Sequence, residues 1–321
     1  MANGSLSSIP VGTELHGVIV RGYGLYYDVA IDGIEGEVLR CTLRGMLKRQ
    51  RRRTDPAAVG DRVRATMTTP ETPEGDPPEG VIEEILPRVR ALSRLARGTQ
   101  DVEQVIVANP DQLVAVFAIR EPEPHPRLID RFLLIAEARD LSAIICFNKA
   151  DLADPGDVDA LAEPYRPAGY PIVTTSARTG EGIDELKGML AGKITAFAGP
   201  SGVGKSSLLN AIAPERAERT GEVSQATGKG RHTTTWTTLF RVAPDTWVAD
   251  TPGIRALRLW GVQPDELDRL YPEFRPHLDA CYYADCRHIN EPGCAILAAV
   301  ESGEIHPARY ESYRSFVEND E

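Results

Sequence analysis

A glycine-rich segment in the second half of the chain has the residue types that bind a chain of phosphates. Residues 199–206 match the pattern G-x-x-x-x-G-K-[ST] and lie between an apolar run at 194–198 and a helical pattern at 205–212. The glycines let backbone N–H groups turn around phosphate oxygens, and the positive end of the following helix attracts the same group. Lys205 is predicted to reach the β- and γ-phosphates, and Ser206 is predicted to ligate Mg²⁺. The predicted phosphate contacts are Gly199, Pro200, Ser201, Gly202, Val203, Gly204, Lys205, Ser206 and Ser207.

A second short motif can select one nucleotide base. The sequence N-K-A-D at 148–151 follows an apolar run that predicts a strand. The carboxylate of Asp151 can accept hydrogen bonds from N1–H and the 2-amino group of guanine. Adenine offers neither donor, so its binding would leave a buried carboxylate unpaired, at a cost of about 1–3 kcal/mol. Asn148 is predicted to brace the neighbouring loops or to contact the base, and the stem of Lys149 is predicted to lie over its ring.

Two further pairs of residues follow predicted strands, where ligands of open α/β sheets bind. Ser176 and Ala177 end one strand and could present backbone N–H groups to guanine O6. Asp250 and Gly253 belong to the sequence D-T-P-G after another strand. Asp250 could hold Mg²⁺ through water, and the Gly253 N–H could meet the γ-phosphate. Each pair taken alone would indicate only an ordinary turn.

The segment G-K-G-R-H-T-T-T at 228–235 combines flexible glycines with three threonines. One threonine of such a segment can ligate Mg²⁺ only while the γ-phosphate is present, so the segment orders with GTP and relaxes after hydrolysis. We favour Thr234 as this ligand, although the spacing does not separate it from its neighbours. Without the other motifs, the segment would be interpreted as a polar loop.

Three cysteines and a histidine lie close together near the end of the chain. Cys281, Cys286, His288 and Cys294 form the pattern C-x4-C-x-H-x5-C. Three thiolates and an imidazole make a closed set of zinc ligands that leaves no position for a substrate, so a structural zinc site is predicted. The alternative is a group of buried or free cysteines beside a surface histidine.

The elements that must position these motifs alternate in type through the centre of the chain. This alternation predicts a parallel sheet with helices on both faces. The predicted strands are 104–108, 112–118, 143–147, 171–175, 194–198 and 246–249, and the predicted helices are 127–138, 157–162, 183–190 and 205–212. Beyond the sheet, helical patterns occupy 263–270, 295–302 and 307–317. The basic and aromatic residues of the last helix could meet a partner, but packing of that helix is the favoured interpretation.

Five short strand-like runs precede the central region, at 14–20, 25–31, 36–40, 62–68 and 80–85. So many short strands in under a hundred residues predict a small β-barrel, with the OB-fold as the leading candidate. Tyr23, Tyr26 and Tyr27 could stack on bases, but tyrosines of a small barrel are more often part of its core or rim.

An uninterrupted basic stretch follows the third of these runs. Its basic residues are Arg40, Arg44, Lys48, Arg49, Arg51, Arg52 and Arg53. On a protein with a net charge of −11, such a stretch predicts contact with an RNA backbone, although a solvated loop is the alternative. The overall charge argues against indiscriminate nucleic-acid binding.

Length and composition fit a soluble multidomain protein. The chain has 321 residues, 42% of them hydrophobic, which is enough for two or three packed cores. No apolar run approaches the length that spans a membrane, and the N-terminus has no apolar signal core. We therefore predict a cytoplasmic, monomeric protein without a membrane partner.

The order of the motifs points to a family. Ordinary GTPases begin with the phosphate loop and end with N-K-x-D and S-A, whereas here the last two come first, at 148–151 and 176–177. The chain thus resembles the circularly permuted GTPases. With its N-terminal barrel and its Cys/His motif, it closely resembles the RsgA/YjeQ family of small-ribosomal-subunit biogenesis GTPases over nearly its whole length.

The resemblance implies three domains: an OB-fold RNA-binding domain at 1–92, a circularly permuted GTPase domain at 93–258 and a mainly helical zinc-binding domain at 259–321. It implies GTP hydrolysis stimulated by the small ribosomal subunit, with Mg²⁺ and one Zn²⁺ bound and with contact to ribosomal RNA. Ile254 occupies the position where many GTPases have a water-orienting glutamine, so slow intrinsic hydrolysis is expected. His232 is then a candidate for positioning the attacking water.

Two other functions were compatible with the motifs. One is a GTP-dependent RNA-binding switch that acts outside ribosome assembly. The other is a metabolic enzyme that transfers phosphate to a small molecule, which N-K-x-D disfavours.

Overall fold

The computed structural model describes residues 5–45, 47, 56–73, 76–95, 103–214, 237–250 and 264–319. The chain forms two compact units, each assembled from segments that are distant in sequence. The first unit comprises residues 1–111, 190–196 and 216–254, and the second comprises 112–189, 197–215 and 255–321. The domain boundaries at residues 92 and 258 stay a prediction.

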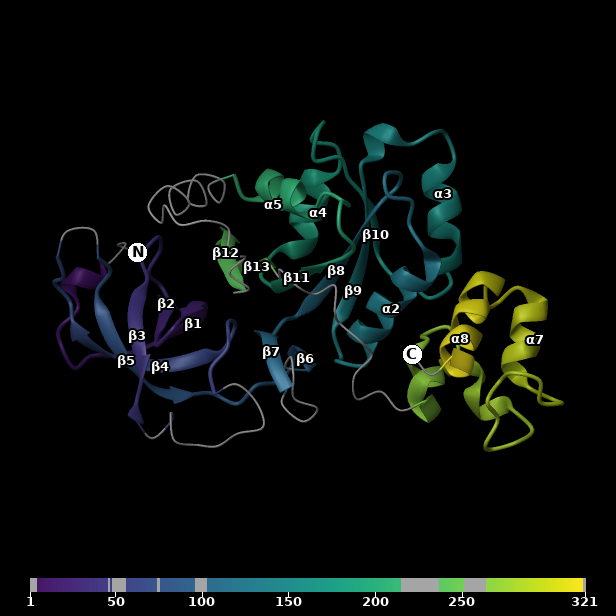
Figure 1. Ribbon diagram of the computed structural model, residues 1–321, viewed down its shortest axis with the longest axis horizontal. Coiled ribbons are helices and arrows are strands. Elements are labelled where there is room, and N and C mark those ends of the chain that lie inside the picture. Colours follow the sequence, from purple (N-terminus) through teal and green to yellow (C-terminus); the bar gives the residue numbers. More distant parts are fainter. Residues whose placement is uncertain are drawn as a thin grey trace. The chain divides into compact units, whose positions relative to one another are not determined.

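Five strands of the first unit close into a small barrel (Figure 1). They are β1 (Glu14–Tyr23), β2 (Tyr26–Ile31), β3 (Leu39–Leu43), β4 (Arg62–Thr69) and β5 (Glu79–Ile85). β1 pairs antiparallel with both β2 and β4, β3 pairs with β2 and runs parallel to β5, and β4 pairs with β5. The ring of pairings is therefore complete, and the predicted OB-like barrel is confirmed.

The third strand of the barrel begins later than the sequence pattern indicates. The expected run was 36–40, but Gly36 has φ +78°, a left-handed conformation that ends extended pairing. β3 instead covers Leu39–Leu43, where buried Leu39, Cys41 and Leu43 alternate with partly exposed neighbours. This period of two is what a strand with one face toward a core requires.

The first unit also contains two hairpins and a short 3₁₀ helix, η1 (Leu6–Ser8). β6 (Ala91–Leu95) pairs antiparallel with β7 (Glu103–Ala108) in a separate two-stranded sheet. β12 (Thr238–Ala243) pairs antiparallel with β13 (Thr246–Asp250), and Thr238 also pairs with Arg21 of β1. The strands expected at 104–108 and 246–249 therefore exist. β7 pairs with β6 in a sheet of its own and so does not join the predicted parallel sheet, whereas β13 lies between β12 and β11 (Ile194–Ala198) in the larger sheet.

The second unit is built on a parallel sheet. Three of its strands pair in parallel: β8 (Gln112–Ala118), β9 (Ser142–Asn148) and β10 (Ile172–Thr174). The neighbour of β8 on its other edge is β11 (Ile194–Ala198), of which Phe197 and Ala198 belong to this unit. Every residue of β8 is buried, which is typical of a strand with helices on both faces. The α/β class predicted for this region is confirmed.

Four α-helices accompany these strands within two residues of their predicted bounds. They are α2 (Pro126–Glu137), α3 (Asp157–Ala162), α4 (Ile183–Leu190) and α5 (Lys205–Ile212), with the short 3₁₀ helices η2 (Ala150–Leu152) and η3 (Glu163–Tyr165). α2 starts with a proline, whose fixed φ suits a first helical turn. Its apolar side packs on the sheet, where the ring of Phe132 meets that of Phe117 from β8 at a centroid distance of 6.0 Å.

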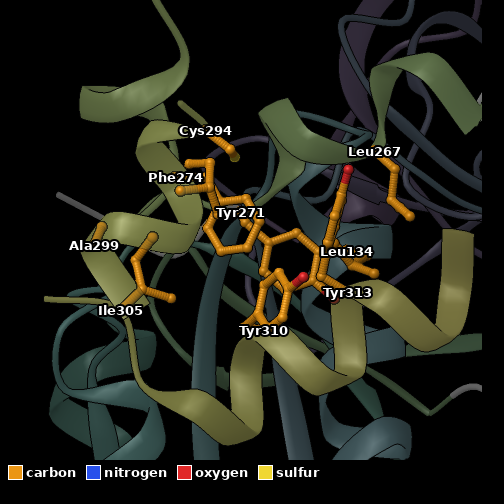
Figure 2. Close-up of a cluster of buried hydrophobic side chains, with 10 residues drawn as sticks. Leu134, Leu267, Tyr271, Phe274, Cys294, Ala299, Ile305, Tyr310 and Tyr313 are labelled. Atoms are coloured by element: carbon orange, nitrogen blue, oxygen red, sulfur yellow. The ribbon is translucent and has the colours of Figure 1, made fainter. Parts of the chain in front are cut away.

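The last part of the second unit is mainly helical, as predicted. It contains the 3₁₀ helices η5 (Pro264–Leu270) and η6 (Arg275–Ala280) and the α-helices α7 (Ala295–Ser302) and α8 (Pro307–Asn319). Their core is aromatic: Figure 2 shows Tyr271, Phe274 and Tyr313 packed together, with ring centroids 4.9–5.5 Å apart. Leu134 of α2 joins the same cluster, so this core is continuous with the helix that covers the parallel sheet.

A buried arginine reinforces the connection between α2 and α8. The guanidinium of Arg309 donates to both carboxylate oxygens of Glu273, at 2.6 and 3.2 Å, and it also bonds Asp130 of α2. Although burial alone would lower the pKa of Arg309, the two carboxylates hold that pKa well above its ordinary value, so the side chain is charged. Tyr310 and Tyr313 are buried as well. The last helix thus packs into the protein, as the favoured interpretation of its sequence held.

Candidate functional site

The glycine-rich segment connects β11 to α5 through a backbone that only glycine tolerates. Gly199, Gly202 and Gly204 have φ values of +149°, +81° and +90°. A Cβ at Gly199 would lie 2.1 Å from the carbonyl oxygen of Val116, and a Cβ at Gly204 would lie 2.5 Å from Nδ2 of Asn148. Conformation therefore favours glycine at all three positions, and close approach also requires it at Gly199 and Gly204.

The polar side chains of the same segment face outward at the start of α5. Val203 is buried and anchors the loop, whereas Ser201, Ser206 and Ser207 are exposed. Nζ of Lys205 donates to the carbonyl oxygens of Gly199 at 2.8 Å and of Pro200 at 2.6 Å, so the lysine bridges the loop. An exposed helix N-terminus with a lysine over a glycine loop matches the chemistry of an anion site.

Asn148 joins three of the candidate motifs. It ends β9 and is 1% exposed. Its Nδ2 donates to the carbonyl oxygen of Val203 at 2.8 Å. Its Oδ1 accepts from the Thr175 hydroxyl at 3.2 Å and from the Ala177 backbone N–H at 3.4 Å. One buried side chain therefore holds N-K-x-D, S-A and the glycine-rich loop together.

Asp151 lies beside the S-A segment with its carboxylate engaged on both oxygens. The Ser176 hydroxyl donates to Oδ1 at 2.5 Å, and Nε of Arg178 donates to Oδ2 at 2.7 Å. The Ser176 bond, followed by the Arg178 bond, lowers the pKa of Asp151 below its ordinary value. The carboxylate is thus ionised and able to accept two hydrogen bonds from a base.

Lys149 has a backbone conformation that suits a tight turn after the strand. Its φ is +64°, and its Nζ donates to the carbonyl oxygen of Glu121. The side chain is only partly buried, so its methylene stem remains available to cover a ring.

The remaining predicted nucleotide residues are not placed by the structure. His232, Thr234 and Gly253 lie outside the described residues, as does Ile254. Asp250 ends β13 opposite Thr238, but only its backbone is described.

The basic stretch is described in part. Lys48, Arg49 and the arginines at 51–53 lie outside the described residues. Arg40 donates to the Tyr23 hydroxyl at 2.9 Å and to Asp76 at 3.1 Å, and Arg44 pairs with Glu83. Tyr23 and Tyr26 form a tilted pair at 6.1 Å on the barrel surface.

The four predicted zinc ligands meet in space. Their ligand atoms all lie within 4.8 Å of one another. Nδ1 of His288 is 3.5 Å from Sγ of Cys281 and 3.4 Å from Sγ of Cys294. Zinc bonds of about 2.3 Å to sulfur and about 2.0 Å to nitrogen, at a tetrahedral angle, require an N···S separation of about 3.5 Å. The arrangement therefore fits a zinc ion.

Hydrogen bonding favours the metal-binding form of one thiol in this cluster, that of Cys281, whereas burial raises the pKa of Cys286 to about 12 and also raises the pKa of Cys294. His288 and Cys294 are buried, and Cys281 and Cys286 are partly exposed. Burial opposes ionisation of Cys281, but the N–H of Ala295 donates to its sulfur, and the pKa of that thiol is lowered overall. A thiolate is the form that binds zinc.

Three contacts at these sites were not predicted. They are the Arg178–Asp151 bond, the choice of Val203 as the loop residue to which Asn148 bonds, and the approach of Asp268 to His288; that Asn148 could brace the neighbouring loops was one of its two predicted roles. Arg178 follows S-A directly, so its position was a usable signal. The other two join residues far apart in sequence, and no local pattern indicates them.

Within the parts of the chain that the structure describes, every helix is too short or too polar to cross a membrane.

Comparison with known proteins gives consistent results. A family model described as RsgA GTPase matches residues 85–260, and one described as RsgA N-terminal domain matches residues 16–72. The small ribosomal subunit biogenesis GTPases RsgA of Gemmatimonas aurantiaca and Moorella thermoacetica are 44% and 46% identical to this chain; each comparison covers 94% of this chain and 96% of the relative.

Two solved structures are similar over nearly the whole chain. The crystal structure of YjeQ from Thermotoga maritima has a TM-score of 0.75 at 37% identity and covers 96% of this chain and 98% of that one. The structure of YloQ, described as a circularly permuted GTPase, has a TM-score of 0.73 at 30% identity and covers 96% of each chain. Since a family model spans more than half of the sequence and these relatives align almost end to end, the protein belongs to the RsgA GTPase family.

Proposed function

We propose that this protein hydrolyses GTP to GDP and phosphate and assists late maturation of the small ribosomal subunit, which stimulates its activity. The observation that carries the nucleotide assignment is the bonding of Asn148 to both the 175–177 segment and Val203. This bonding connects the proposed base-selecting motif with the proposed phosphate loop, although the two motifs occur in the reverse of the order found in ordinary GTPases. The names of the relatives supply the ribosomal part of the proposal.

The base would be selected by Asp151. Its low pKa keeps it ionised, and the Ser176 hydroxyl fixes one of its oxygens. The predicted contact of guanine O6 would fall to the backbone N–H of Ala177, whose hydrogen bond to Asn148 is long at 3.4 Å, because the N–H of buried Ser176 donates to the Glu181 carbonyl oxygen at 3.0 Å. The Lys149 stem would cover the ring. A base without N1–H and a 2-amino group would leave the carboxylate unpaired.

The phosphates would be held by residues 199–207. The three positive-φ glycines leave space for backbone N–H groups to approach an anion, and Lys205 would exchange its two carbonyl partners for phosphate oxygens. Mg²⁺, when bound to Ser206, Thr234 and Asp250, would neutralise charge on the phosphates. The Gly253 N–H would meet the γ-phosphate. Catalysis would rest on positioning and charge stabilisation, with His232 orienting the attacking water.

Zinc would be held by Cys281, Cys286, His288 and Cys294 in a structural role. All four positions of a tetrahedral ion are then filled, and Cys294 also belongs to the aromatic core of the C-terminal helices. Bound zinc would supply a cross-link for a loop that has little apolar content of its own.

Ribosomal RNA would be contacted through the N-terminal barrel and its basic stretch. The tilted pair of Tyr23 and Tyr26, with Tyr26 44% exposed, offers a surface on which a base could stack. We propose that the protein acts as a cytoplasmic monomer, independently of membranes.

GTP hydrolysis by the purified protein, with and without small ribosomal subunits, tests the central proposal. We expect large stimulation by subunits, loss of turnover in Lys205→Ala, and wild-type turnover in Lys187→Ala, a control in α4. Slow turnover that subunits do not change would support the assignment as a GTPase but contradict the assignment of the small ribosomal subunit as its partner. That result would favour the alternative function, a GTP-dependent RNA-binding switch that acts outside ribosome assembly.

Two substitutions test individual roles. Asp151→Asn should abolish the preference for guanine over xanthine nucleotides, because an amide can donate to the xanthine 2-oxygen. Full guanine selectivity in this variant would contradict the base assignment. His232→Ala should lower subunit-stimulated turnover without weakening GTP binding, and unchanged turnover would remove the histidine from the mechanism.

A further inference from the structure

The ring of His288 is held from two sides. Nδ1 faces the thiols of Cys281 and Cys294, at 3.5 and 3.4 Å, while Nε2 lies 3.4 Å from Oδ2 of Asp268. Since a neutral imidazole carries one proton, a carboxylate that accepts from Nε2–H leaves the lone pair of Nδ1 directed at the thiols. This is the tautomer that a metal at the cluster requires.

Asp268 comes from outside the Cys/His motif. It lies in η5, well before the first cysteine, and its side chain is 21% exposed, whereas that of His288 is 3% exposed. Water therefore has little access to the far side of the ring, and Asp268 is the acceptor that the described structure provides for Nε2. A carboxylate behind a buried metal-facing histidine is a recurrent arrangement that orients the ring and raises its basicity as a ligand.

The backbone around His288 is held by other groups. The hydroxyls of Tyr310 and Tyr313 in α8 donate to the carbonyl oxygens of His288 and Arg287, both at 2.9 Å. The carboxylate of Glu291 accepts from the N–H groups of residues 287, 289 and 290 at 2.8–3.0 Å. The path of the loop therefore does not depend on Asp268, and the contribution of Asp268 is specific to the imidazole ring.

We propose that Asp268 is a positioning residue of the zinc site: it accepts the Nε2 proton of His288 and thereby fixes Nδ1 as the metal-binding atom. This inference rests on the zinc site proposed above. It assigns a function at the metal site to an aspartate that lies outside the motif of ligands.

Asp268→Asn is the informative change, since asparagine keeps the size and an oxygen acceptor but removes the charge. That oxygen can still accept from the Arg269 N–H, which Asp268 Oδ1 accepts at 2.7 Å, so η5 should be retained. Asp265→Asn, an exposed position on the same short helix, is the matched control. Asp268→Glu keeps the carboxylate on a longer chain.

Zinc affinity is measured at fixed pH by competition with a chromophoric chelator, and the geometry of the ligands is measured from the absorption spectrum of the Co²⁺-loaded protein. We expect Asp268→Asn to weaken zinc binding about 10- to 100-fold and to alter the Co²⁺ spectrum. Asp268→Glu should bind more tightly than Asp268→Asn, and Asp265→Asn should match the wild type. Far-UV circular dichroism at saturating zinc checks that each variant is folded.

Three results would count against the inference, each in a different way. Wild-type affinity and spectrum in Asp268→Asn would overturn it outright. Equal losses in the asparagine and glutamate variants would assign the effect to packing and not to the carboxylate. A wild-type protein that holds no zinc, and is unaffected by Cys286→Ser, would instead overturn the zinc site itself.

Discussion

Replacing Arg309 by methionine should destabilise the contact between α8 and α2 strongly. The side chain is 1% exposed, and its two partners Asp130 and Glu273 are equally enclosed, with side-chain exposures of 1% and 3%. Removing one member of a buried ionic group costs about 3–5 kcal/mol, because the remaining charge is neither solvated nor paired. Methionine also forfeits the attraction between the guanidinium and the Tyr271 ring, whose centroid lies 4.6 Å from it.

The stability lost in Arg309→Met should be greater at neutral pH than at acid pH. Burial already raises the pKa of Asp130 above its ordinary value, and Arg309 opposes that rise. Without the arginine the pKa rises further. A carboxyl group whose pKa is higher in the folded state than in the unfolded state favours folding below its unfolded pKa, of about 3.9. This contribution to the free energy of unfolding is lost as the pH rises through the pKa of the folded state. The deficit of Arg309→Met should therefore be largest at neutral pH and should shrink on acidification.

Hydrogen exchange of peptides from α2 and α8 is the appropriate assay, since it reports the free energy of local opening in each helix. At about 1.4 kcal/mol per tenfold change, we expect protected amides of α8 to exchange at least about 100-fold faster at pH 7. Arg314→Met is the matched control: this arginine is on the same helix, with pairs to exposed glutamates, and should change opening by less than about 0.5 kcal/mol. Adding Asp130→Asn to Arg309→Met should recover part of the loss. Wild-type exchange in Arg309→Met, or a deficit that grows toward acid pH, would refute the reasoning.

Gly204→Ala should weaken GTP binding at least about tenfold, since the residue has φ +90° and the new Cβ would lie 2.5 Å from Nδ2 of Asn148. Gly188→Ala, a helical position with open space around it, should bind a fluorescent GTP analogue like the wild type; equal affinity in both variants would contradict the close fit of the loop. Burial raises the pKa of Cys41 and of Cys146 to about 12, so both thiols should resist alkylation at pH 8 until the protein is unfolded in urea. Mass spectrometry of digested protein checks this, and rapid labelling of either cysteine in the folded protein would refute it.

Much of the fold follows from local sequence patterns. The apolar runs of β8 and β9 and the helical patterns of α2, α4 and α5 predict their elements to within two residues, because period and burial are local properties. β6 and β12 were missed because polar residues interrupt their apolar sequences, ALSRL and TLFRVA, so neither forms the continuous apolar run by which β11 was predicted. β3 was displaced because a single glycine with positive φ decides where extended pairing can begin.

The candidate site was predictable in its motifs but not in its bonds. The types and order of residues at 148–151, 176–177 and 199–206 indicate the chemistry of a guanine nucleotide site. The hydrogen bond between Asn148 and Val203 spans 55 positions, and the approach of Asp268 to His288 spans 20. Such contacts depend on how strands and helices pack, which the spacing of residues in the chain does not encode.

Within the second unit, the helix α2 connects the candidate nucleotide site with the candidate metal site. One side of α2 packs on β8 and β9, and β9 ends at Asn148. The same helix supplies Asp130 to the guanidinium of Arg309 and Leu134 to the aromatic core that contains Cys294. The C-terminal helices are therefore anchored on the sheet by packing and by a buried charge, in addition to the chain connection at 251–263. It follows that zinc and a nucleotide, each bound as proposed above, would both favour the folded state of the helix that the two candidate sites share.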